Sequence, residues 1–238
     1  MLDQIKLDKV IFIDIETVPL FPSHDLLSEK WKKLWERKSG YIGKEDQSPE
    51  DLYDRAGIYA EFGKIICISI GIIREIEGKK NLRVKSFSGD DEKVLLTDFS
   101  ALLRNHFKAS DYLLCAHNGK EFDFPYIARR ILVNGLKIPY LLDTAGRKPW
   151  EIQHLDTLQL WKFGDYKNYT SLDVLTTLFN IPTPKSDMDG SDVARVYWEE
   201  KDLARIVEYC QRDVIAVAQL ILKYKGEDLL DPKSIIVA

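Results

Sequence analysis

Two acidic residues, Asp14 and Glu16, lie at the end of a run of β-branched and aromatic residues near the start of the chain. If this run is a strand, the two-residue period puts both side chains on one face, about 6 to 7 Å apart. Two carboxylates that close repel each other unless a cation joins them. A metal site is therefore one interpretation. The other is a strand that simply ends in solvent with charged residues.

A third carboxylate, Asp123, belongs to the segment His-Asn-Gly-Lys-Glu-Phe-Asp, which follows another apolar run. It comes early in a predicted helix, where an acidic residue also gains about 0.3 to 1 kcal/mol from the helix dipole. Taken alone, Asp123 is better explained by this dipole than by catalysis. His117, which opens the segment, is expected to be a hydrogen-bonded polar residue at a strand end rather than a ligand.

Tyr209 and Asp213, late in the chain, are four residues apart in a strongly helical stretch. That spacing places the phenol beside the carboxylate on one helix face. In the structural interpretation, Tyr209 is half-buried and Asp213 pairs with Arg205 or Arg212. Each acidic motif has such an alternative, but the three motifs together favour a catalytic site.

The elements that would position these residues alternate between strands and helices. Apolar and β-branched runs predict strands at residues 9–15, 64–74, 82–87, 112–116 and 152–155. Helical periodicity predicts helices at residues 90–107, 122–133, 171–179, 191–200 and 202–222. Asp156 and Thr157 are predicted to begin a helix, with a place in the cleft as the less favoured alternative. The pattern predicts an α/β fold, in which helices flank a mixed, mostly covered sheet of about five strands, in one domain over residues 1–238.

Residues 17–62 have a different character, because three prolines interrupt them. We predict an insertion with one amphipathic helix, whose apolar positions are Leu27, Trp31, Leu34 and Trp35. The polar side of this helix is basic, with Lys30, Lys32, Lys33, Arg37 and Lys38. It could guide a single strand of nucleic acid toward the site, although a solvated helix face is the commoner explanation. Residues 225–238 are predicted to be a C-terminal tail.

The composition excludes several classes of protein. Of the 238 residues, 45% are hydrophobic and 30% are charged, which is typical of soluble globular proteins and not of disordered, collagen-like or disulfide-scaffold chains. The longest apolar stretch, around residues 65–73, is about half the ~18 residues that a membrane span needs, so no membrane partner is expected. No secretory signal is readable and the three cysteines lack zinc spacing, so a cytoplasmic protein with reduced thiols is expected.

The charge balance of 34 basic against 38 acidic residues gives a net charge of −4. This argues against a protein whose main task is to coat nucleic acid. It does not exclude an enzyme that acts on nucleic acid, because bound cations would reverse the local field of clustered carboxylates.

Asp-x-Glu on a first strand, Asn-x-x-x-Phe-Asp after a later strand and Tyr-x-x-x-Asp on a late helix resemble, in this order, the three motifs of the DEDD superfamily of 3′→5′ exonucleases. The tyrosine is typical of the DEDDy branch, since the histidine branch would have histidine where this chain has Glu208. The longer matches, Phe-Ile-Asp-Ile-Glu-Thr and His-Asn-Gly-Lys-x-Phe-Asp-x-Pro-Tyr-Ile, most resemble the proofreading exonuclease domain of family B DNA polymerases and the predicted stand-alone exonucleases related to it. The resemblance covers about residues 9–224 and implies a ribonuclease H-like fold.

The resemblance also implies a two-metal-ion mechanism with Mg²⁺ or Mn²⁺, the cations that hard carboxylate oxygens suit. Asp14 would bind both ions, Glu16 and Asp213 would bind the ion that activates water, and Asp123 would bind the other. Tyr209 would orient the attacking water, because a phenol with a pKa near 10 is a poor anionic base at neutral pH.

Three residues are candidates for substrate contacts: Asn118, Lys120 and Phe122. The amide of Asn118 could bind the 3′-terminal nucleotide and the ring of Phe122 could pack against a base or sugar, although loop capping and core packing explain these residues equally well. The expected reaction is release of nucleoside 5′-monophosphates from single-stranded or frayed DNA 3′ ends. An exoribonuclease is the alternative, because contacts to the 2′-OH cannot be identified from the motifs. A non-catalytic nucleic-acid-binding module is disfavoured by the complete set of four acids and the tyrosine.

Overall fold

Apolar, β-branched runs form the centre of a six-stranded sheet, because such side chains pack well where both faces of a sheet are covered. The structure, a computed structural model, describes residues 2–43, 46–108, 111–165, 167, 169–182 and 188–238. The strands are β1 (Val10–Pro19), β2 (Gly63–Ile76), β3 (Lys79–Ser88), β4 (Leu113–Ala116), β5 (Leu155–Asp156) and β6 (Ile235–Val237), in the order β5-β4-β1-β2-β3-β6. The sheet is mixed, since the β1–β2 and β2–β3 pairs are antiparallel and the other three pairs are parallel.

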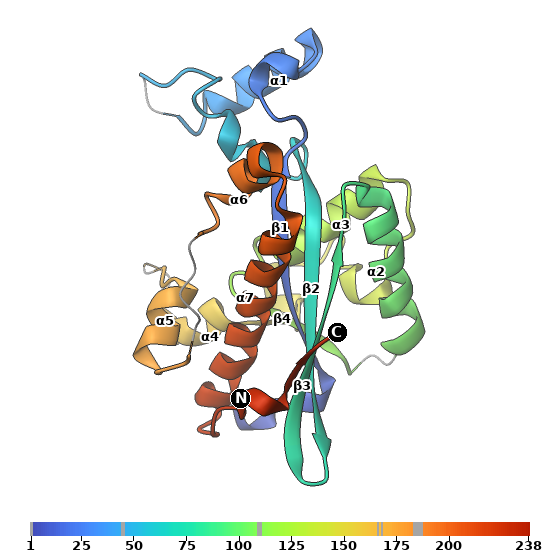
Figure 1. Cartoon of the computed structure of the whole chain (residues 1–238), viewed down its shortest axis with the longest axis vertical. Helices are drawn as coiled ribbons and strands as arrows, with labels where there is room; N and C mark the ends of the chain where they lie inside the picture. Colours follow the sequence, from blue (N-terminus) through green and yellow to red (C-terminus); the bar gives the residue numbers. More distant parts are fainter. Residues whose placement is uncertain (1, 44–45, 109–110, 166, 168, 183–187) are drawn as a thin grey trace.

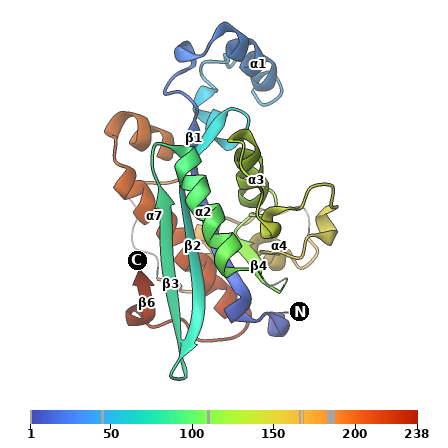
Figure 2. The same cartoon turned by 90° about the vertical axis from the view of Figure 1, so that its right-hand side faces the viewer.

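Helices cover both faces of the sheet (Figures 1 and 2). On one face lie α2 (Glu92–His106) and α3 (Asp123–Val133), and on the other lies the long α7 (Leu203–Tyr224), with α4 (Thr157–Lys162) and α5 (Leu172–Leu178) beside it. Gly71 of β2 lets α7 lie close to the sheet, because a Cβ at this position would come 2.7 Å from Cγ1 of Val214. The helix is thus held against the centre of the sheet next to Asp213.

The predicted helices and the structure agree to within two residues for α2, α3, α5 and α7. The helix predicted at 191–200 is divided into α6 (Val193–Arg195) and a π-helical turn, η7 (Val196–Glu200), which ends where Lys201 adopts a φ of 58°. None of the described helices combines the length and the apolar character needed to cross a bilayer.

The strands differ from the prediction at four places, of which one is the hairpin, since β2 continues to Ile76 and β3 begins at Lys79 rather than at residue 82. β1 continues to Pro19, into the predicted insertion, because residues 17–19 pair with residues 63–65 of β2. β5 has two residues rather than four, since His154 bonds the β4 backbone through its side chain: Nδ1 accepts from the N–H of Leu114 at 3.2 Å. The apolar residues of β6 form a strand beside β3, within the segment predicted to be a tail, so the sheet has six strands instead of about five.

The described residues of the insertion, 20–43 and 46–62, form a lobe beyond the end of β1 (Figure 1, top). Its helix is α1 (Glu29–Ser39), and its small core surrounds Trp35, whose indole N–H donates to the carbonyl of Pro49 at 2.7 Å. The predicted apolar position Leu34 is 37% exposed, because it lies on the flank of α1 that points away from this core. We call residues 20–62 the insertion lobe.

A buried ion pair anchors the chain where it returns from the insertion lobe to the sheet. Nη2 of Arg130 on α3 lies 2.6 Å from Oε2 of Glu92 on α2, and both side chains are buried. The other groups of this pair bind backbone: Arg130 Nη1 donates to the carbonyl of Ala60, and Glu92 Oε1 accepts from the N–H of Ile65. The pair therefore joins two helices to the first residues of β2.

Candidate active site

The Asp14 and Glu16 side chains lie on the face of β1 that α7 covers. The residue Asp14 as a whole is half-buried, but its Oδ2 atom is buried and has no hydrogen-bond partner among the described residues. Ligand atoms of Asp14, Glu16 and Cys210 all lie within 4.8 Å of one another. Burial raises the pKa of each carboxyl well above its usual value, and the negative charges of neighbouring acids raise it further.

Asp123 begins α3 and lies next to this pair. Its buried carboxylate accepts hydrogen bonds from its own backbone N–H and from that of Ile15, the residue between the two acids of β1. Burial raises the pKa of Asp123 to about 7, against the lowering effect of these hydrogen bonds, and the charges of Asp156 and Asp213 add to the rise. The third motif residue is thus both the first residue of a helix and a member of the acidic cluster.

Tyr209 and Asp213 lie one turn apart on α7, as the spacing predicts. Burial and the charge of Asp173 raise the pKa of Asp213 to about 6, while a hydrogen bond from Tyr209 and the charge of Arg212 lower it. Burial, Asp213 and Glu16 also raise the pKa of the half-buried Tyr209. The phenol therefore keeps its proton at neutral pH and can donate a hydrogen bond.

The side chain of Asp156 joins two parts of the chain, whereas the sequence predicted mainly that it begins a helix. The side chain does cap α4, with Oδ1 accepting from the N–H of Leu158 at 3.0 Å. It also binds the loop between β4 and α3: Oδ1 accepts from Asn118 N–H at 3.0 Å and Oδ2 accepts from Lys120 N–H at 3.1 Å. Asn118 has a left-handed φ of 64°, so these bonds hold a strained loop that leads into Asp123.

Gly119 is required in this loop, because a Cβ would come 2.4 Å from Cβ of Ala116. The substrate candidates Asn118, Lys120 and Phe122 therefore lie on the loop and turn that carry Asp123. Phe122 packs partly on the core, with its ring centroid 5.4 Å from that of Tyr126. Burial lowers the pKa of Lys120, which is half-buried. Contact of these residues with substrate stays a prediction.

His117 is confirmed as a hydrogen-bonded residue at a strand end. Its Nδ1 lies 2.9 Å from Oγ1 of Thr157, and its Nε2 lies 2.9 Å from the carbonyl oxygen of Thr170. Both ring nitrogens are therefore engaged within the protein, and burial lowers the pKa of the ring.

The donor set of the acidic cluster fits a hard divalent cation. The carboxylates of Asp14 and Glu16 supply oxygen ligand atoms within 4.8 Å of each other, while Asp123 and Asp213 lie close enough for their charges to raise the pKa of Asp14. The Oδ2 atom of Asp14 has no partner among the described residues and lacks the hydrogen bond that a buried oxygen otherwise needs. The Cys210 thiol is the only soft group in this set of ligand atoms; burial raises its pKa, and its Sγ donates to the carbonyl of Asp14 at 3.4 Å. This Sγ is thus engaged with backbone, and the carboxylate oxygens that remain suit Mg²⁺ or Mn²⁺ better than Zn²⁺.

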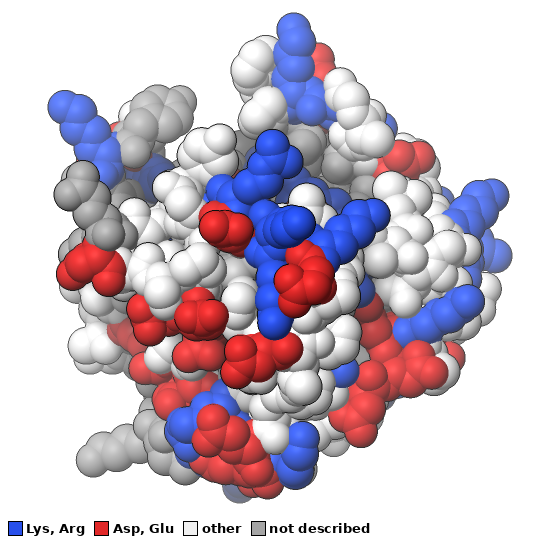
Figure 3. Space-filling model, turned by 90° about the horizontal axis from the view of Figure 1, so that it is seen from above, with Lys and Arg blue, Asp and Glu red and all other residues white. Residues whose placement is uncertain are grey.

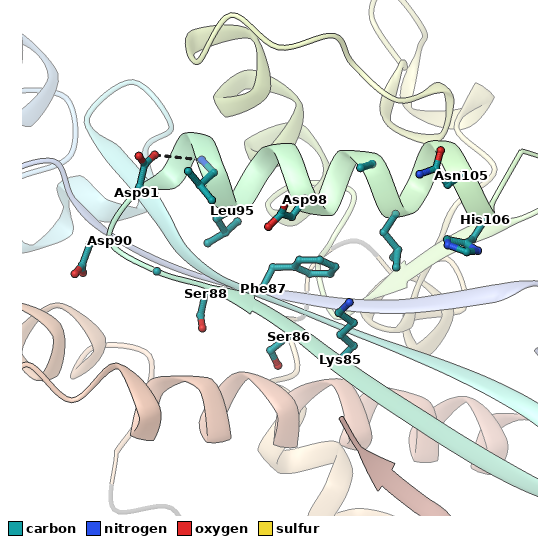
Figure 4. A pocket seen from close by; sticks show the side chains of 14 residues that line it. Lys85, Ser86, Phe87, Ser88, Asp90, Asp91, Leu95, Asp98, Asn105 and His106 are labelled. Atoms are coloured by element: carbon teal, nitrogen blue, oxygen red, sulfur yellow. Dashed lines mark hydrogen bonds between the residues drawn. The ribbon is translucent and has the colours of Figure 1, made fainter.

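A separate hollow of about 740 Å³ lies between β3 and α2 (Figure 4). Its lining includes Lys85, Phe87, Asp98, Asn105 and His106. It opens on the face of the sheet that α2 covers, whereas the acidic cluster lies on the α7 face. The size of a hollow therefore does not identify the candidate active site in this protein.

Comparisons with known proteins support the α/β fold described above and identify a family for this chain. Residues 58–231 match a family described as "Predicted 3'-5' exonuclease related to the exonuclease domain of PolB", a match that contains Asp123, Tyr209 and Asp213 but begins after Asp14 and Glu16. The fold is similar to that of the family B DNA polymerase from the hyperthermophilic archaeon Pyrobaculum calidifontis, with a TM-score of 0.52 and 15% identity over 90% of this chain and 24% of that chain. This chain thus spans about a quarter of the polymerase's length. Because the family match covers most of the chain, the protein belongs to the family of predicted 3′–5′ exonucleases related to the exonuclease domain of PolB.

Proposed function

We propose that this chain forms one exonuclease domain that hydrolyses single-stranded or frayed DNA from the 3′ end and releases nucleoside 5′-monophosphates. One observation carries the proposal: strand β1, the start of α3 and the middle of α7 bring four carboxylates together, and one buried oxygen of Asp14 has no hydrogen-bond partner among the described residues. Membership in a family of predicted 3′–5′ exonucleases supports the same reaction.

In this proposal, Asp14, Glu16, Asp123 and Asp213 hold two Mg²⁺ or Mn²⁺ ions. Bound ions would lower the pKa of water and stabilise the leaving oxygen. The protein's own contribution is to keep four acids at one place, although burial and mutual repulsion favour their neutral forms. The packing of the sheet and of the helices that carry these carboxylates offsets the cost of holding them close together.

Tyr209 would orient the attacking water by donating a hydrogen bond. Its raised pKa excludes the phenolate at neutral pH, so the role of base falls elsewhere. Asn118, Lys120 and Phe122 are proposed to contact the terminal nucleotide, because they share the loop that Asp156 fixes beside Asp123.

The test is hydrolysis of single strands of DNA and RNA, labelled at either the 3′ or the 5′ end, with Mg²⁺, Mn²⁺ or EDTA. We expect mononucleotide release from the 3′ end of DNA with either cation and none with EDTA. Faster hydrolysis of RNA would instead identify the exoribonuclease alternative. The proposal is wrong if the purified chain releases no mononucleotide from any substrate with either cation.

A matched control separates this activity from a contaminating nuclease. Asp98 on α2 is an exposed carboxylate on the opposite face of the sheet. Asp98→Ala removes the same charge as Asp213→Ala but should leave hydrolysis unchanged. Loss of hydrolysis in Asp213→Ala but not in Asp98→Ala would assign the activity to this chain rather than to a contaminant.

A further inference from the structure

The outward face of α1 carries a stripe of three cations, Lys30, Lys33 and Arg37, which we call the α1 stripe. They are spaced at i, i+3 and i+7, so they lie on one side of the helix. All three are exposed, whereas Trp31 and Trp35 on the opposite side face the core of the insertion lobe. The stripe is about 10 Å long, from the 1.5 Å rise per residue.

Within the described part of the chain, no carboxylate lies within 4 Å of the cations of the α1 stripe. The neighbouring basic residues of the helix do have partners: Lys32 lies 3.6 Å from Glu29, and Lys38 lies over the ring of Tyr59 at 4.1 Å. Like charges three and four residues apart destabilise a helix. An external anion would relieve the repulsion among these three cations.

The stripe is positive because the cations of the insertion lobe are concentrated on α1, and not because the lobe as a whole is basic. Residues 20–62 contain seven Lys or Arg and nine Asp or Glu, yet five of the seven cations lie on α1, which has only two acids. Figure 3 looks down on the end of the molecule that carries the lobe and shows Lys and Arg side chains gathered near the middle, with acidic groups around them. Basic side chains that contact only water would not need to be separated from acidic side chains in this way.

The insertion lobe also lies within reach of the acidic cluster. Strand β1 carries Glu16 and enters the lobe after Pro19, so about 10 Å of strand separates the two at 3.3 Å per residue. A single strand whose 3′ end lies at the carboxylates and which leaves toward this end of the sheet passes the base of the lobe first. It reaches α1, which lies farther out, only beyond its last few nucleotides (Figure 1).

We infer that the α1 stripe binds the sugar-phosphate backbone of single-stranded nucleic acid, on the 5′ side of the terminal nucleotide. This inference rests on the proposed function, because the direction of the strand is set by a 3′ end at the acidic cluster. Three cations over about 10 Å match roughly two to three successive phosphates, and such contacts are independent of base sequence. The lobe thereby retains long substrates between successive cleavages.

The test compares the wild-type chain with the triple variant Lys30→Gln, Lys33→Gln, Arg37→Gln. A matched control variant carries Lys93→Gln, Arg104→Gln and Lys108→Gln, which removes three exposed cations on and after α2. Binding of labelled 4- and 20-nucleotide single strands is measured in EDTA across a salt series, so that binding is observed without hydrolysis. The same strands are then hydrolysed with Mn²⁺ under single-turnover conditions.

For the 20-nucleotide strand, we expect the triple variant to bind at least about tenfold more weakly at low salt. The slope of log K against log salt should fall in magnitude by about 2, since each lost contact contributes about 0.7. The control variant and the 4-nucleotide strand should show no comparable change, and the maximal rate of hydrolysis should stay within about twofold.

An unchanged affinity and salt slope in the triple variant would overturn the inference and leave the stripe a solvated helix face. A wild-type chain that binds no single strand would also overturn it. A stripe-dependent affinity in a chain that hydrolyses nothing would support the binding surface while contradicting the exonuclease proposal, so the two failures are distinguishable.

Discussion

At Asp14 the protein leaves a buried carboxylate oxygen without a hydrogen-bond partner among the described residues. Leaving a buried acceptor unsatisfied costs about 1 to 3 kcal/mol, and a nearby acid such as Glu16 makes ionisation of the pair costlier still. An arrangement that destabilises the metal-free protein and suits a hard cation is typical of a functional site. The sequence predicted which residues belong here, because each acid stands at a fixed offset within its own strand or helix.

We expect Asp14→Ala and Asp213→Ala to reduce hydrolysis to less than about a tenth of the wild-type rate, because each removes a ligand that the proposed mechanism needs. The fold should survive. Since each variant relieves repulsion among buried acids, its free energy of unfolding in EDTA should equal or exceed that of the wild type. Hydrolysis is measured on a labelled single strand and stability by urea titration. If both variants keep more than a tenth of the activity, these carboxylates do not bind the catalytic ions.

Tyr209→Phe removes only the hydroxyl that we assign to orienting water. Positioned groups of this kind contribute about 10² to 10⁴-fold, and a metal that already activates the water should keep this effect at or below about 10². The apparent affinity for Mn²⁺ should not change. Single-turnover cleavage at saturating Mn²⁺ measures the loss, and an unchanged rate would mean that Tyr209 has a structural role only.

At the scale of elements, strands and helices with a clear period were predictable, and those held by side-chain contacts were not. The helix α7 was predictable because its apolar residues recur at helical spacing over 22 residues. β5 is shorter than predicted because His154 occupies its hydrogen-bonding position, and β6 is too short to have a period. Asp156 was predicted to start a helix, but its bonds to the loop after β4 depend on a contact 38 residues away in sequence.

The variant Asp156→Asn tests whether the hydrogen bonds to the Asp156 carboxylate set the position of the loop between β4 and α3. The amide keeps an acceptor for the α4 cap but replaces one oxygen, so the N–H of Lys120 loses its partner. We expect the KM for a single strand to rise by about tenfold or less, with a smaller loss of kcat, because the loop carries the candidate substrate contacts. Steady-state kinetics on a short strand measure both constants. A change in thermal stability with unaltered kinetics would assign Asp156 to folding alone.

The buried pair between Glu92 and Arg130 could not be predicted from the sequence either, because the two residues are 38 positions apart and lie on different helices. Arg130→Met should lower the free energy of unfolding by about 3 to 5 kcal/mol, because it leaves an uncompensated buried carboxylate. Adding Glu92→Gln should restore part of that loss. Urea titration of both variants and the wild type measures the difference. A single variant as stable as the wild type would show that the pair does not anchor the base of the insertion lobe.

For the molecule as a whole, the sequence indicated the fold, the reaction and the basic side of the insertion helix, but not which cations of that helix have partners within the protein. The net charge of −4 argued against a protein whose main task is to coat nucleic acid, yet this total conceals a helix with five cations and only two acids. In the same way, four buried or half-buried acids come from β1, α3 and α7 to one place. The stability of the entire chain should therefore depend on pH and on divalent cations together.

In EDTA, we expect the free energy of unfolding to fall as the pH rises from about 5 to 8. Asp123 and Asp213 have pKa values of about 7 and about 6 in the folded protein, above their usual value of 3.8, so the folded state holds protons that the unfolded chain has lost. Stability then declines with pH through that window, by on the order of 2 to 4 kcal/mol. Urea titrations at several pH values, with and without Mg²⁺, measure the effect.

Two histidines act in the opposite direction, the half-buried His117 and the buried His154. Desolvation lowers the pKa values of both rings, so their contribution to stability is lost as the pH falls below about 6.5. The comparison with Asp123→Asn separates the two effects, since this variant keeps both histidines and loses one titrating acid. The wild-type stability should fall more steeply with pH than that of the variant in EDTA. Saturating Mg²⁺ should remove most of this difference, because a bound cation favours the ionised carboxylates at every pH in the range. Equal slopes for the two proteins in EDTA would mean that Asp123 is ionised in the folded chain, and that the acidic cluster is open to water rather than buried.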